Sequence, residues 1–180
     1  MTTSASRTVT INRAPVLTLW AAVVAERLGF DYAEALTLGR AVAGLNAYAK
    51  GVRLGIYEPS PETVKKQRKV LGQEARLTVS LVHRAVPVAR TPAGLRALAK
   101  DKPIDPASVE RYLASKFGPS LDAVRQAMVK LAAAMPPREI AAEAYAHYEK
   151  FRPDIPAGVG GWGAKGLLDL AVIEELARKR

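Results

Sequence analysis

Residues that can carry acid–base or metal chemistry are few in this 180-residue chain, and they lie far apart. The two histidines, His83 and His147, fall in different expected elements, and no serine lies in the Gly-x-Ser-x-Gly pattern of a hydrolase nucleophile. Glu139 with Glu143, and Glu143 with His147, form two pairs at four-residue spacing, but a pair of ligands on one helix face does not make a metal site. The chain has no cysteine, which removes thiolate ligands and thiol nucleophiles. We therefore predict that the protein is not an enzyme and has no catalytic residue, metal or cofactor.

A glycine-rich stretch near the C-terminus, residues 157–166 (AGVGGWGAKG), raises the question of a phosphate-binding loop. The spacing Gly-x-Gly-x-x-Gly of dinucleotide-binding folds occurs formally from Gly158 to Gly163, but a helix rather than a strand is expected before it. The stretch also lacks the Ser or Thr that follows the lysine of a P-loop, here Lys165. The pattern favours a flexible strap that seats Trp162 in the core. The alternative is an anion held on the backbone amides at the start of the last helix.

The formal net charge of +10 is concentrated in one part of the chain. Residues 50–102 carry twelve basic and four acidic side chains, whereas residues 1–49 and 103–180 carry a net charge of +1 each. A local excess of positive charge attracts polyanions such as nucleic acid. The alternative is a solvated basic face that has no partner. Within this segment, phosphate contacts are expected from six side chains: Lys65, Lys66, Arg68, Lys69, Arg76 and Arg84.

Residues 110–127 (ERYLASKFGPSLDAVRQA) resemble a helix-turn-helix, with Gly118 at the turn. Leu113 and Phe117 would pack the first helix, and Ala114 would lie where the two helices cross. Arginine and glutamine on the exposed face of the second helix suit base edges in a DNA major groove. The alternative is a helical hairpin of the kind common in all-helical proteins that never meet DNA. The resemblance implies three further contacts: Arg125, Gln126 and Lys130.

Hydrophobic periodicity predicts a mainly α fold, a bundle of six or seven helices with a minor β-hairpin or ribbon around residues 76–90. We expect a loose arm over residues 1–12, a short helix over 91–99 and a last helix over 167–177. The whole chain, residues 1–180, is expected to form a single domain with a possible subdivision near residue 103.

The helix expected over residues 31–53 has a wide apolar circumference, which is typical of a central, largely buried helix. Gly39 and Gly44 would let a neighbouring helix approach closely. Asn46 would serve as a structural hydrogen-bonding node, and the alternative is a contact to a ligand. A capping-box pattern, Asp31 followed by Glu34, marks the start of this helix.

These observations favour a non-enzymatic, cytoplasmic protein that binds nucleic acid through the basic 50–102 segment and the helix-turn-helix at 110–127. The alternative is a helical interaction or oligomerisation module, in which the helix over 31–53 pairs with its copy in a second chain. No membrane partner is expected, because the longest nearly apolar run, residues 15–25, is shorter than the roughly 20 residues that span a bilayer.

Overall fold

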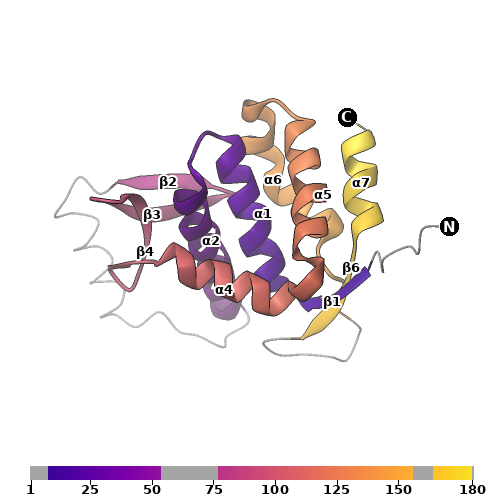
Figure 1. Cartoon of the computed structure of the whole chain (residues 1–180), viewed down its shortest axis with the longest axis horizontal. Helices are drawn as coiled ribbons and strands as arrows, with labels where there is room; N and C mark the ends of the chain where they lie inside the picture. Colours follow the sequence, from indigo (N-terminus) through magenta and orange to yellow (C-terminus); the bar gives the residue numbers. More distant parts are fainter. Residues whose placement is uncertain (1–7, 54–76, 156–163, 180) are drawn as a thin grey trace.

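The computed structural model describes residues 8–53, 77–155 and 164–179 of the chain (Figure 1). Its helices are α1 (Arg13–Arg27), α2 (Tyr32–Arg53), α4 (Pro106–Phe117), α5 (Leu121–Ala133), α6 (Pro137–Phe151) and α7 (Leu170–Arg178). Its strands are β1 (Thr8–Asn12), β2 (Thr78–Leu81), β3 (Arg84–Thr91), β4 (Gly94–Ala99), β5 (Lys102–Pro103) and β6 (Lys165–Asp169). A short 3-10 turn, η1 (Gly118–Ser120), joins α4 to α5.

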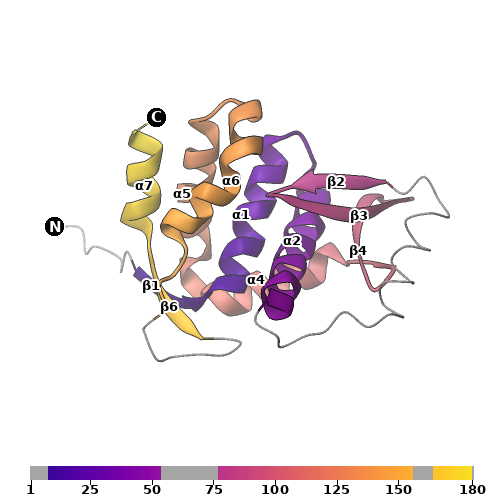
Figure 2. The ribbon, with the colours of Figure 1, turned by 180° about the vertical axis from the view of Figure 1, so that it is seen from behind.

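The architecture is mixed α/β, and the prediction of a mainly α bundle with a minor hairpin around residues 76–90 is wrong. Two antiparallel sheets accompany the helices: β1 pairs with β6, and the larger sheet has the strand order β2-β3-β4-β5. The predicted hairpin exists as β2 and β3, but β4 and β5 extend it into a four-stranded sheet. Figures 1 and 2 show the larger sheet at one end of the molecule and the β1–β6 sheet toward the other, where α7 also lies, with α1 between the two sheets.

Helix α1 runs through the centre of the molecule. Every residue from Pro15 to Ala25 is buried, so this helix has no polar face. It contacts α2, α4, α5 and α6. A helix that is apolar all round is stable only when neighbours cover every side. The sequence pattern predicts α2 as the central helix. In the structure α1 is the central helix, and α2 exposes Arg40 and Gly44.

Side chains of α1 bind main-chain carbonyl groups of the helices around it. Trp20 is fully buried, and its indole Nε1 donates a hydrogen bond to the carbonyl oxygen of Ala144 in α6, at 2.9 Å. Arg27, in the last turn, donates from Nε to the carbonyl oxygen of Ala132 at 3.2 Å and from Nη2 to that of Met135 at 3.0 Å. A helix leaves its last carbonyl groups without partners in the helix, and Arg27 satisfies this need at the end of α5. These bonds orient α5 and α6 against α1.

Helices α1 and α2 approach each other closely at Gly39. A Cβ atom at this position would clash with the carbonyl oxygen of Thr18 and would lie 2.9 Å from the amide nitrogen of Ala22. The predicted role of Gly39 in close helix approach is therefore confirmed. The same prediction for Gly44 is wrong, because a Cβ there would meet no atom within 4 Å.

The larger sheet is joined to α2 by hydrogen bonds from the main chain of β4. Oε2 of Glu34 accepts from the amide of Leu95, and Oγ1 of Thr37 accepts from the amide of Ala97, each at 3.0 Å. β5 pairs with the last two residues of β4, whereas α2 supplies the acceptors for two amides nearer the start of the strand. Glu34 also forms the predicted capping box with Asp31, through bonds of 2.8 and 3.1 Å, which confirms that prediction.

The prediction of a short helix over residues 91–99 is wrong: these residues form a turn and then β4. Thr91 followed by Pro92 suits the start of a helix, but it suits the first two positions of a β-turn equally well. Gly94 has a φ of +121°, which ends the turn, and Oγ1 of Thr91 donates to its carbonyl oxygen at 2.7 Å. Beyond the turn, Ala97 pairs with Val88 of β3.

Two hairpin turns place residues other than glycine at positive φ. Val82 (48°) and His83 (61°) join β2 to β3, and Lys100 (51°) and Asp101 (65°) join β4 to β5. A left-handed conformation costs an L-residue roughly 1–2 kcal/mol. Val82 is buried, so its packing offsets the strain in the first turn, whereas Lys100 and Asp101 are both exposed.

The small sheet joins the two ends of the described chain. β1 pairs with β6 from Thr8 opposite Asp169 to Asn12 opposite Lys165. The prediction of a loose arm is therefore wrong for residues 8–12.

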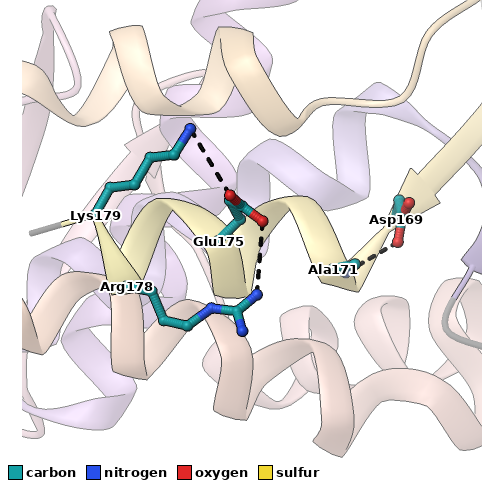
Figure 3. A network of polar contacts seen from close by, with 5 residues as sticks. All are labelled: Asp169, Ala171, Glu175, Arg178 and Lys179. Atoms are coloured by element: carbon teal, nitrogen blue, oxygen red, sulfur yellow. Dashed lines mark hydrogen bonds and ion pairs between the residues drawn. The ribbon is translucent and has the colours of Figure 1, made fainter.

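Helix α7 begins at Leu170, because the first residues of the helix predicted over 167–177 belong to β6. Figure 3 shows how polar groups fix both ends of α7. Asp169 caps the helix by accepting from the amide of Ala171 at 2.9 Å. Glu175 pairs with Arg178 at 3.6 Å and with Lys179 at 3.8 Å in the last turns.

Gly39→Ala is expected to lower the free energy of unfolding by about 1–3 kcal/mol, the usual cost of overpacking, although alanine has the higher helix propensity. Gly44→Ala is the matched control on the same helix. It is expected to raise the free energy of unfolding by up to about 1 kcal/mol, because its methyl group meets open space. Urea denaturation of both variants measures the difference, and a gain of equal size in both would contradict the close approach at Gly39.

The double variant Lys100→Asn/Asp101→Gly is expected to raise the free energy of unfolding by about 1 kcal/mol, because Asn-Gly favours a two-residue turn with both φ angles positive. The equivalent change in the other turn, Val82→Asn/His83→Gly, is expected to lower it, because the buried Val82 side chain is lost. Thermal and urea unfolding of the two variants would show these opposite signs. A loss of stability in the first variant would argue against a strained Lys100-Asp101 turn.

Candidate nucleic-acid interface

The segment that resembles a helix-turn-helix folds as α4, η1 and α5. Asp105 caps α4 by accepting from the amide of Ala107 at 3.1 Å, and Gly118 ends the helix with a φ of +57°. Figure 1 shows α4 lying across the molecule at the end where α5 begins. Leu113 and Phe117 are buried as predicted. Ala114 is exposed, so the prediction that the two helices cross at this residue is wrong.

The outward face of α5 carries polar side chains. Its buried stripe consists of Val124, Ala127, Met128, Leu131 and Ala132. Opposite this stripe, Asp122, Gln126 and Lys130 are exposed at four-residue spacing, and Val129 beside them has 47% of its surface exposed. The face therefore presents a carboxylate, an amide, an ammonium group and one apolar side chain in a single row.

Arg125 lies at the edge of this face, where groups from three other helices surround it. Its guanidinium carbon is 5.5 Å from the centroid of the Tyr32 ring in α2. The hydroxyl group of Tyr32 donates to Glu110 of α4, and partial burial together with this bond raises the pKa of Tyr32. Desolvation raises the pKa of Glu26 in α1, and the charge of Arg125 partly opposes that rise. Arg125 thus takes part in contacts within the protein, unlike Gln126 and Lys130. No sequence pattern predicts the contact of Tyr32 with Glu110, because these residues lie on different helices.

Of the basic residues predicted in the 50–102 segment, Arg84 is described by the structure. It is half-buried, and its Nη2 donates to Oδ1 of Asn46 in α2 at 3.0 Å. Asn46 therefore acts as the predicted structural node. The other five predicted contacts lie outside the described residues: Lys65, Lys66, Arg68, Lys69 and Arg76.

Other cations of this segment lie on the larger sheet. Arg96 folds onto its own turn, with Nη1 donating to the carbonyl oxygen of Leu95 at 2.8 Å. Arg90, Lys100 and Lys102 are exposed, and none of them forms an ion pair with a carboxylate of the described residues. Arg90 pairs with Leu95 and Lys102 with Ala99 on the opposite side of β4, and these two partners are about 13 Å apart along the strand at the usual rise per residue. These cations are therefore spread along the sheet.

The residues considered above for metal or phosphate binding contact other groups of the protein. Nε2 of His147 lies 3.6 Å from a carboxylate oxygen of Glu143, and His147 is buried in α6. Among residues 8–53, 77–155 and 164–179, no three His, Asp or Glu side chains gather closely enough to hold a metal ion. Gly166 packs directly on the main chain of Asp154. The rest of the glycine-rich stretch through Gly163, with Trp162, lies outside the described residues.

No protein-family profile, curated protein or solved structure shows a significant match to the chain. Within the part of the chain that the structure describes, no helix combines the length and the apolar character needed to cross a membrane.

Glu26→Gln is expected to make the protein slightly more stable at pH 7. The folded protein raises the pKa of this carboxyl group, so it binds the proton more tightly than the unfolded chain, and stability falls as the pH rises above the ordinary value of 4.5. The gain should be small, because Glu26 is exposed, and it should disappear as the pH falls toward 4. Urea denaturation at both pH values measures it. Glu175→Gln is the control, since Glu175 pairs with two cations and should show no gain at pH 7.

Proposed function

We propose that the protein binds nucleic acid through the outward face of α5, with α4 as the supporting helix. The observation that carries this proposal is the exposed row of Asp122, Gln126 and Lys130, opposite a buried stripe that fixes α5 in the core. The net charge of +10 supports it, because the long-range field of a basic protein draws a polyanion toward any surface that fits it.

The side chains of this row have the chemistry of base readout in a major groove. The amide of Gln126 can donate to and accept from one adenine, and the carboxylate of Asp122 can accept from cytosine. Lys130 can reach guanine or a phosphate, and the exposed Val129 can contact a thymine methyl group. Duplex DNA is therefore the form of nucleic acid that this face fits best.

The alternative is a module that oligomerises through α2. It depended on an apolar face of α2 that is free to pair with a second chain. The apolar faces of α2 pack against α1 on one side and against α4, β3 and β4 on others. Along the part of α2 whose side chains are described, the exposed residues are Tyr32, Arg40, Gly44 and Tyr48, which do not form an apolar stripe.

Fluorescence anisotropy of a labelled duplex, titrated with the full chain at low and at moderate salt, tests the proposal. We expect binding at low salt that weakens steeply as the salt concentration rises. Lys130→Ala should weaken binding and reduce the slope of log affinity against log salt by about one, because one phosphate contact is lost. Gln126→Ala should weaken binding to some duplex sequences more than to others.

Lys150→Ala is the matched control. Lys150 is also an exposed lysine, on α6, which lies on the near side of the molecule in Figure 2, whereas α5 lies on the near side in Figure 1. The Lys150→Ala variant should bind the labelled duplex as tightly as the wild type does. Absence of binding at low salt, or an equal loss in Lys130→Ala and Lys150→Ala, would overturn the assignment of the interface to α5.

A further inference from the structure

Arg84 is a cation placed inside the contact between the larger sheet and α2. It pairs with Leu81 across the β2–β3 hairpin, so its side chain lies on the same face of the sheet as Leu81 and Val86. Both of these residues are buried. From this face Nη2 of Arg84 reaches Oδ1 of Asn46 on α2, at 3.0 Å.

The guanidinium group of Arg84 is incompletely satisfied by the protein. Its Nε is buried and has no hydrogen-bond acceptor among the residues that the structure describes. No carboxylate of these residues forms an ion pair with it. A buried donor without an acceptor and a half-buried charge without a counter-charge are both unfavourable, and both are rare in folded proteins. One bound anion would remove both penalties.

The turn before Arg84 fixes the position of this residue. Val82, at a φ of 48°, is buried in the core with 3% of its surface exposed. The ring of His83, at a φ of 61°, lies 6.0 Å from that of Tyr145 in α6. A strained backbone persists where the surrounding structure holds it in place. β3 therefore starts from an anchored point, which fixes the position of its first side chain.

We propose that Arg84 and Asn46 bind a small oxyanion, a carboxylate or a phosphate group, where β3 meets α2. The guanidinium supplies the positive charge and the Nε–H donor. Asn46, whose Oδ1 accepts from Arg84, still has two amide N–H donors for the same anion. Nε of Arg84 is buried and the residue as a whole is half-buried, so the ligand must be small, unlike the backbone of a duplex. This site is independent of the proposed binding of nucleic acid by α5.

The Nε–Hε signal of Arg84 in a proton–nitrogen NMR spectrum reports directly on the proposed hydrogen bond. Arg84→Lys, in which this signal disappears, assigns it, and triple-resonance spectra of the wild type assign it should that variant not fold. Sodium phosphate and sodium acetate are titrated separately into the full chain, at an ionic strength held constant with sodium chloride. We expect a saturable shift of the signal, and the anion that saturates it at the lower concentration identifies the preferred ligand class.

Two variants test the residues. Asn46→Ala should weaken the binding of the preferred anion by roughly tenfold, the effect of losing one hydrogen bond to a charged group. Arg90→Lys is the matched control on the same strand, with an exposed guanidinium, and it should leave binding unchanged.

Three outcomes would overturn the proposal. The first is no response of the Arg84 signal to either anion, which would assign Nε to ordered water. The second is a shift that does not saturate and that the Arg90 signal shares, which would indicate general ionic screening. The third is a response to duplex DNA with none to phosphate or acetate, which would place Arg84 in a nucleic-acid interface instead.

Discussion

The burial of α1 on all sides is the constraint on which the rest of the structure depends. A segment that is apolar from Pro15 to Ala25 is stable in water only when other elements cover it completely. Its hydrogen-bond donors then orient the covering elements, because Trp20 and Arg27 bind specific carbonyl groups of α6 and of the α5 C-terminal end. The inner faces of α5 and α6 pack against α1. The outward face of α5 is left exposed.

Helix α2 connects the core around α1 to the larger sheet. On one side it meets α1 at Gly39, where the two backbones are close enough to exclude a methyl group. On another side Glu34 and Thr37 accept hydrogen bonds from alternate amides of β4, and Asn46 accepts from the first residue of β3. Bonds to alternate residues of a strand set its register, since a shift by one residue would turn its buried face outward. The Arg84–Asn46 contact is therefore part of the scaffold as well as a candidate ligand site.

The sequence predicts the helices well and the sheets poorly, for a physical reason. Helical periodicity and capping are local, so α4 with its Asp105 cap and α2 with its capping box could be predicted. The segment from Thr91 to Gly94 carries local signals for both a helix start and a turn, and pairing with β3, which no local pattern reveals, decides between them. β1 and β6 are separated by most of the chain, so their pairing has no local signal at all.

Residue type and position along the chain do not decide what a cation does in the folded protein. Arg84, Arg96 and Arg125 all come from segments predicted to face a polyanion, yet each is engaged by the protein itself, through an amide, a main-chain carbonyl group and an aromatic ring. Arginine serves such contacts readily, because its planar group offers several donors and is weakly hydrated. Lys130 lies opposite the buried stripe of α5 and is exposed as helical periodicity requires. The position of a charge relative to the buried stripe of its own helix is therefore a better guide to its availability than the net charge of the surrounding segment.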